Sequence, residues 1–178
     1  MNYELSDELK SFFKQSTKQL IMPDVVTGSE VQFNKEQVES ILPQRDPFLL
    51  IDRIKKINLT ERCAIAEYDL HHANDVLAGH FPYYPIWPGV LQIEAIGQTG
   101  AFAGLITHHQ PSLNCYITYV CGAQFISPIT NVDGKVEMRS CFFEDGMFFI
   151  VIGQCIYENR ICSVAAVKGL LHEQGKAL

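Results

Sequence analysis

The sequence is poor in positive charge, with 14 lysines and arginines against 20 aspartates and glutamates and a net charge of −6. Proteins that bind nucleic acid normally carry a basic surplus or a basic stripe, so this balance argues against that class. The sequence also has no G-x-S-x-G, Walker A or G-x-G-x-x-G motif. The usual signatures of α/β-hydrolases, P-loop enzymes and dinucleotide-binding domains are therefore missing.

Long apolar runs are also missing. The best candidate, residues 90–106, contains Gln92, Glu94 and Gln98 and is shorter than the ~20 residues that a membrane span requires. We therefore interpret it as a buried helix and expect no membrane span. The first ten residues, MNYELSDELK, are acidic and have no apolar core, so we do not expect a secretory signal.

The six cysteines include no C-x-x-C pair, and most of them lie in apolar, strand-like runs. This pattern favours buried, reduced thiols in a cytoplasmic protein over a framework of disulfides or metal ligands. The adjacent pairs His71-His72 and His108-His109 lack the i, i+4 spacing of a helical metal site. We predict no metal site.

The chain has 178 residues, about the length of one domain, and 47% of them are hydrophobic. Helix signals occupy residues 4–20 and 35–42, and a long helix begins after Pro88. Strand signals, rich in β-branched and aromatic residues, lie at 48–57, 62–70, 116–126, 135–143, 147–157 and 161–171. Because these strands follow one another in sequence, we expect an antiparallel sheet.

Three glycines of the long helix, Gly97, Gly100 and Gly104, lie three and four residues apart, on one side of it. Each glycine costs a helix about 1 kcal/mol relative to alanine, so we expect the helix to approach another backbone closely. A sheet wrapped around the helix is the simplest arrangement. The predicted fold class is α+β, with residues 1–35 as an N-terminal helical extension and linker and residues 36–178 as the main domain.

The stretch GHFPYYPIWPGVLQIEAIGQTGAFAG places His80 on a proline-rich loop and Glu94 in an otherwise apolar helix. A carboxylate there either borders a cavity, where it can act as a general acid, or lies at the rim of the helix start. His80 is either a base or a structural loop residue. The backbone N–H groups of Gly89 and Val90 can hold an oxyanion. Together these groups suit proton removal beside a carbonyl.

Two stretches, LPQRDPFLLIDRI (residues 42–54) and GHFPYYPIWPGVLQIEAIGQTGA (residues 79–101), resemble the β-hydroxyacyl-acyl carrier protein dehydratases of type II fatty-acid synthesis. The closer branch is the one with a catalytic glutamate. The resemblance implies a hot-dog fold, an antiparallel β-sheet wrapped around a long central α-helix. It implies dehydration of (3R)-3-hydroxyacyl-acyl carrier protein to trans-2-enoyl-acyl carrier protein in the cytoplasm, without a cofactor.

The resemblance also assigns roles within the candidate site. His80 would remove the α-proton, and Glu94 would protonate the departing hydroxyl with help from water or Gln98. The N–H of Gly89 would hold the thioester oxygen. It further implies a homodimer, often three dimers together, in which His80 of one subunit faces Glu94 of the other. The remaining candidate substrate-binding residues are Val90, Phe81, Tyr84 and Trp87.

The sequence departs from the family pattern at several positions. Tyr83, Tyr84 and Trp87 are bulkier than the usual residues and lie where they would reshape the acyl tunnel. Gln44 and Asp46 replace a histidine and an aromatic residue. The stretch FISPITNVD, residues 125–133, lacks the basic residues that help the family to dock its acidic carrier.

These departures leave three functional interpretations. The first is a dehydratase, in which Lys55, Lys56 and Arg62 are candidates to replace the missing basic residues. The second is a thioesterase on the same hot-dog fold. The third is a non-catalytic, acyl-binding partner of another dehydratase.

Overall fold

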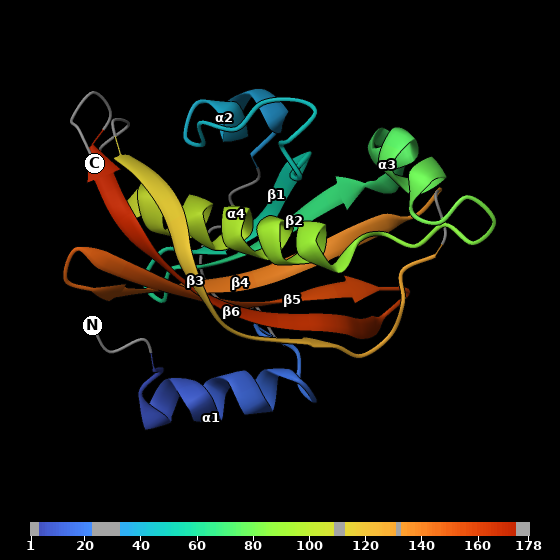
Figure 1. The fold of residues 1–178 in the computed structure, drawn as a ribbon. Helices are drawn as coiled ribbons and strands as arrows, with labels where there is room; N and C mark the ends of the chain where they lie inside the picture. The colour runs from blue at the N-terminus through green and yellow to red at the C-terminus, as the bar shows by residue number, and fades with distance from the viewer. Residues whose placement is uncertain (1–3, 23–32, 109–112, 131–132, 174–178) are drawn as a thin grey trace.

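The computed structural model describes residues 4–22, 33–108, 113–130 and 133–173. Within these residues, a six-stranded antiparallel sheet has the order β1-β2-β4-β5-β6-β3 (Figure 1). The strands are β1 (Arg53–Asn58), β2 (Cys63–Asp69), β3 (Leu113–Phe125), β4 (Lys135–Asp145), β5 (Phe148–Tyr157) and β6 (Arg160–Glu173). The predicted antiparallel sheet is confirmed, although β1 begins five residues later than expected because residues 48–52 form a loop.

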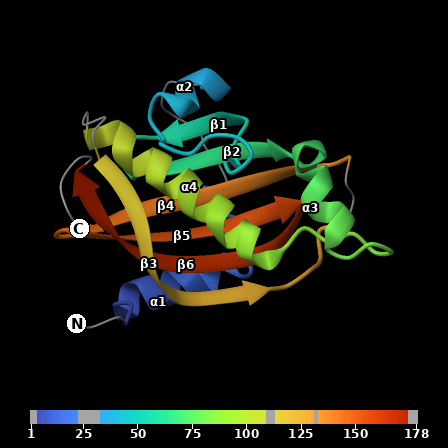
Figure 2. The same ribbon diagram turned by 45° about the horizontal axis from the view of Figure 1, so that its top comes forward.

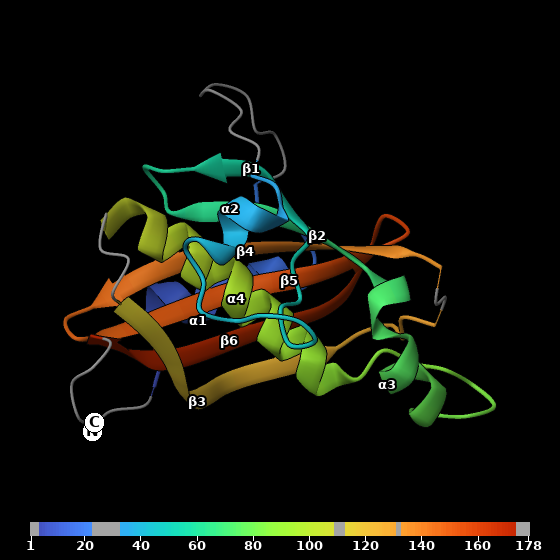
Figure 3. The same cartoon turned by 90° about the horizontal axis from the view of Figure 1, so that it is seen from above.

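The long helix α4 (Gly89–His108) lies across one face of the sheet (Figures 2 and 3). A Cβ atom at Gly97 would lie 3.0 Å from the Ile117 side chain, and one at Gly104 would lie 2.6 Å from the Phe142 ring. The predicted approach to another backbone is therefore wrong, because these glycines make room for side chains of the sheet. None of the helices in the described residues has the length and apolarity needed to cross a membrane.

Short helices complete this face of the molecule. Helix α2 (Lys35–Glu39) begins at a capping box formed by Asn34 and Gln37. A 3-10 turn, η1 (Leu70–Ala73), and helix α3 (Asn74–Gly79) follow β2 and were not predicted from the sequence. Together η1 and α3 carry the chain from the end of the sheet to His80.

The N-terminal helix α1 (Asp7–Ser16) lies on the opposite face of the sheet from α4 (Figure 1). Ser6 caps it by accepting a hydrogen bond from the N–H of Leu9. The apolar side of α1 packs on strand β5 and its neighbours. Leu9, Phe12 and Phe13 of the helix, with Leu5 just before it, contact Ile150, Ile152, Ala166 and Phe143. The helix is shorter than the predicted 4–20, and the predicted linker lies almost wholly outside the described residues.

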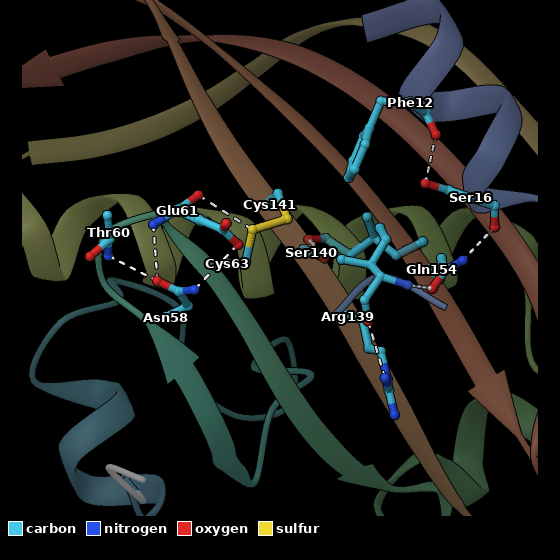
Figure 4. Close-up of a disulfide and its surroundings, with 12 residues drawn as sticks. Phe12, Ser16, Asn58, Thr60, Glu61, Cys63, Arg139, Ser140, Cys141 and Gln154 are labelled. Atoms are coloured by element: carbon cyan, nitrogen blue, oxygen red, sulfur yellow. Dashed lines mark hydrogen bonds between the residues drawn. A yellow bond between two sulfur atoms is a disulfide. The ribbon is translucent and has the colours of Figure 1, made fainter. Parts of the chain in front are cut away.

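A buried glutamine on β5 fastens this extension to the sheet. The side-chain oxygen of Gln154 accepts a hydrogen bond of 2.9 Å from the N–H of Ile21. Its amide nitrogen donates to the carbonyl oxygens of Ser16 and Gln19 (Figure 4). One side chain therefore satisfies three backbone groups at the end of α1.

Replacing Gln154 by leucine is expected to lower the free energy of unfolding by about 2–3 kcal/mol, because buried backbone groups of Ser16 and Ile21 lose their partners. Urea denaturation monitored by circular dichroism measures this change. The matched control is Gln15→Leu, which alters an exposed glutamine of α1. Equal stability of the two variants would contradict a fastening role for Gln154.

Cys63 and Cys141 form a disulfide between β2 and β4, where they are directly opposite partners (Figure 4). The prediction of reduced thiols is therefore wrong for these two residues, because strand register pairs cysteines that are 78 positions apart. The other four cysteines are free. Burial raises the pKa of Cys115 and Cys155 to about 12, so both thiols stay protonated at neutral pH and are poor nucleophiles.

Candidate active site

His80 lies at the base of a tightly bonded loop. Its N–H donates to the carbonyl of Leu77 at the end of α3, and its carbonyl accepts from the N–H of Ile86 at 2.8 Å. Between these points, Phe81 and Tyr84 exchange backbone hydrogen bonds of 3.3 and 3.0 Å. These contacts close the loop on itself and hold His80 beside Ile86.

The imidazole of His80 has a defined orientation. Its Nδ1 lies 2.9 Å from the carbonyl oxygen of Ile86. A carbonyl oxygen only accepts hydrogen bonds, so Nδ1 carries the proton in the neutral ring. Nε2 is then unprotonated, which is the state that a general base requires. The ring also stacks on Phe81 at a centroid distance of 4.3 Å.

Glu94 lies half-buried on α4 and is held by Gln98, one turn further along the helix. The amide nitrogen of Gln98 donates to Glu94 Oε1 at 2.9 Å and to the carbonyl of Phe48 at 2.8 Å. The amide oxygen of Gln98 accepts from the N–H of Leu50 at 2.9 Å. Gln98 thus ties the carboxylate to the loop that precedes β1, which gives it a positioning role.

The start of α4 presents backbone donors beside a cavity. The N–H groups of Gly89 and Val90 precede the first intrahelical hydrogen bonds and have no acceptor within the helix. A Cβ atom at Gly89 would lie 2.6 Å from the Phe125 ring, so this close approach requires glycine. The side chain of Val90 is 72% exposed.

The cavity beside this helix start has a volume of about 500 Å3. It is lined by Ile86, Trp87, Gly89, Val90, Gln92, Phe125, Ile126, Ser127 and Pro128. Trp87 is fully buried, and its ring stacks on Tyr68. Burial, followed by the charges of nearby aspartates, raises the pKa of Tyr68 to about 12, so this tyrosine stays neutral beneath the indole.

The aromatic residues of the loop are exposed to solvent, unlike Trp87. Tyr83 is fully exposed, and Phe81 and Tyr84 are also exposed.

Two candidate carrier-docking residues prove to be paired with carboxylates: Lys55 with Glu137 at 2.8 Å and Arg62 with Glu144 at 2.7 Å. Lys55 lies on β1 and Arg62 directly precedes β2, at the edge of the sheet opposite β3, whereas the cavity adjoins the end of β3.

Within the described residues, no group of three His, Cys, Asp or Glu side chains is arranged to hold a metal ion. His109, from one of the two histidine pairs, lies outside that part of the chain.

Sequence reasoning missed the backbone groups that orient the candidate acid and base. The carbonyls of Ile86 and Phe48 and the N–H of Leu50 hold His80 and Gln98, and a backbone contact has no signature in residue identity. Gln92, which lines the cavity, could have been noticed, because a polar residue in an apolar helix is visible in the sequence. The sequence does not show which residues Gln92 contacts.

An antiparallel sheet lying against one long helix defines the hot-dog class of proteins. Two solved structures share the fold. The dehydratase heterocomplex ApeI:P from Xenorhabdus doucetiae has a TM-score of 0.58 at 12% identity, over 77% of this chain and 91% of that one. The thioesterase HI1161 from Haemophilus influenzae also has a TM-score of 0.58, at 16% identity, over 81% of this chain and 94% of that one.

The FabA-like domain model matches residues 42–158. The 3-hydroxyacyl-(acyl-carrier-protein) dehydratase FabZ of Campylobacter jejuni is 32% identical over 139 residues, which are 76% of this chain and 94% of that protein. The FabZ of Wolinella succinogenes is 26% identical over 151 residues, 81% of this chain and 99% of that protein. The chain belongs to the FabA-like family.

Proposed function

We propose that the protein is a 3-hydroxyacyl-acyl carrier protein dehydratase. Its relatives carry that activity in their names, and the chain spans almost their whole length. The observation that carries the proposal is the fixed tautomer of His80. Its Nδ1–H donates to Ile86, which leaves Nε2 free to accept a proton from carbon.

The proposed reaction balances without a further reactant. His80 Nε2 removes a proton from C2 of a (3R)-3-hydroxyacyl thioester, and that electron pair becomes the C2=C3 double bond. The C3–O bond breaks while Glu94 donates a proton to the hydroxyl, so water leaves. The backbone N–H groups of Gly89 and Val90 stabilise the negative charge that develops on the thioester oxygen. Gln98 holds Glu94 in place.

We also propose that the active form is a homodimer joined at β3. This strand lies at the edge of the sheet, and Tyr116, Ile117, Tyr119 and Val120 on it are each 38–45% exposed. A long edge strand with exposed apolar side chains is a template for pairing with another chain, and most such pairs are twofold symmetric. The dimers would associate further into trimers of dimers. The four free cysteines favour a reducing compartment such as the cytoplasm, whereas the Cys63–Cys141 disulfide favours an oxidising one.

The test uses the purified protein and a 3-hydroxyacyl-acyl carrier protein substrate. Formation of the conjugated enoyl thioester and release of free thiol are followed in the same reaction. Enoyl formation without thiol release supports the dehydratase. Thiol release without an enoyl product indicates a thioesterase. If neither product forms and the protein forms a stable complex with another dehydratase, it is a non-catalytic partner.

A further inference from the structure

The ring of Phe125 fills the place where a side chain of residue 89 would begin. A Cβ atom at Gly89 would lie 2.6 Å from both Cε1 and Cζ of that ring and 3.2 Å from Cδ1. Ordinary contacts between carbon atoms are about 3.5–4.0 Å long, so the end of the ring lies directly against the glycine. The candidate oxyanion donor at the start of α4 therefore rests on an aromatic side chain from the end of β3.

Phe125 is itself held by the sheet. It is the last residue of β3 and lies opposite Ser163 of β6. The next two N–H groups, of Ile126 and Ser127, both donate to the carbonyl of Cys162, at 2.8 and 3.1 Å. The ring therefore extends from a backbone that β6 fixes, and it can hold the start of α4 in place.

Gly89 depends on such a contact more than other residues of α4 do. The first residues of a helix lack intrahelical partners for their N–H groups, and helix ends fray. Glycine has the greatest backbone freedom and no side chain that could anchor it. An oxyanion donor works only when it lies about 2.7–3.1 Å from the oxygen that gains charge. A small movement of Gly89 would therefore weaken its hydrogen bond to the thioester.

The exposure of Phe125 indicates a role at the cavity rather than in the core. The residue is 55% exposed, and it lines the cavity together with Val90 and Ile126, which are 72% and 44% exposed. Because stabilisation by burial scales with the area removed from water, a ring this exposed contributes little to the core. Apolar side chains exposed together around a hollow are typical of ligand-binding sites.

We propose that Phe125 is a positioning residue for the dehydration. Its ring fixes the backbone of Gly89, and with it the N–H group that receives the thioester oxygen. This inference rests on the proposed function, because it takes that oxygen to bind at Gly89. Phe125 takes no part in the proton transfers and acts through the glycine.

Shortening the side chain tests this role. Phe125→Leu keeps an apolar group but removes the end of the ring. We expect it to lower kcat by about tenfold, a part of the hundredfold or more that the loss of an oxyanion donor costs. Phe125→Met, whose longer side chain can reach the glycine, is expected to recover most of that loss. The control is Phe148→Ala, which removes a ring packed on Lys168 at the start of β5 and should leave kcat unchanged.

A double variant tests the contact from the other side. Gly89→Ala places a methyl group against the ring and is expected to lower kcat by about tenfold as well. Added to Phe125→Leu, the same substitution should cost less than it costs in the wild type, because the shorter side chain leaves room for the methyl group. Losses that multiply would show that the two positions act independently and would overturn the inference.

An infrared measurement separates this inference from the proposed function. The probe is an isotope-labelled ketone analogue of butyryl-N-acetylcysteamine, in which CH2 replaces the sulfur. It has neither a hydroxyl at C3 nor a thioester, so neither dehydration nor hydrolysis consumes it. Donation by the N–H of Gly89 is expected to move the carbonyl stretch of the probe to lower wavenumber in the wild type. Phe125→Leu should reduce this shift, and Phe148→Ala should retain it.

The outcomes are distinct. Dehydration with equal kcat in the wild type and Phe125→Leu, or with a carbonyl shift that is equal in both or absent from both, would overturn the inference and leave the dehydratase standing. A shift that Phe125→Leu reduces, without any dehydration, would overturn the proposed function and leave the positioning role standing. Circular dichroism identifies a variant that has not folded. Should Phe125→Leu be one, Phe125→Ile, which has a higher strand propensity, gives the same comparison.

Discussion

Replacing His80 by alanine is expected to lower kcat for dehydration by about a hundredfold to ten-thousandfold, the usual contribution of a general base. The change removes Nε2, which the bond from Nδ1 to Ile86 leaves free to accept the C2 proton. The side chain is only partly buried, so a folded variant is expected. Steady-state formation of the enoyl thioester measures the effect.

His72→Ala is the matched control for this experiment. His72 lies in η1 on the same connection between β2 and the candidate loop, and its imidazole lies 3.1 Å from Asp52 rather than beside the cavity. Its replacement should therefore leave kcat near the wild-type value. Unchanged activity of the His80 variant, or an equal loss in both variants, would remove the assigned role of base from His80.

Much of the architecture could be predicted because it depends on local patterns. Runs of β-branched and aromatic residues and Pro88 at the helix start are encoded over a few residues. These patterns predicted the long helix, the neighbouring strands and the antiparallel sheet. The short helix α3 escaped because its N-cap residue, Ala73, makes no side-chain cap, which is the signal that usually marks a helix start.

The missed features depend on register between distant segments. The Cys63–Cys141 pair exists because β2 and β4 align these two positions, and no spacing rule within the sequence contains that alignment. Gln98 shows the same limit within the candidate site. Its presence near Glu94 was visible, but its bonds to Phe48 and Leu50 cross about 50 residues. Residue identity thus predicts which groups carry chemistry, and tertiary contacts determine how those groups are held.

Glu94→Gln is expected to lower kcat by a factor similar to that for His80, because a carboxamide cannot donate a proton to the leaving hydroxyl. The substitution preserves shape, and its oxygen can still accept from Gln98 Nε2 as Glu94 Oε1 does. The loss should therefore appear in kcat rather than in stability. Glu144→Gln, which alters a carboxylate paired with Arg62 away from α4, is the matched control and should retain activity. A fully active Glu94 variant would remove that residue from the proposed reaction.

Mixing the two inactive variants tests how the acid and base meet. In the described structure, His80 is bound to Ile86 and Glu94 to Gln98, so each group has its own support. If a site combines His80 of one subunit with Glu94 of the other, a mixed His80→Ala and Glu94→Gln dimer contains one intact site. Random exchange between subunits should then restore about a quarter of the wild-type activity, as expected for a twofold dimer with two sites.

A site built within one chain gives the opposite result. Each subunit of the mixed dimer would then lack either the base or the acid, and activity would stay at the level of the single variants. The exchange is checked by mass spectrometry of the intact dimers, which counts the mixed species directly. Recovery of activity that rises with the mixed fraction would establish both the homodimer and the shared site, because neither alone produces it.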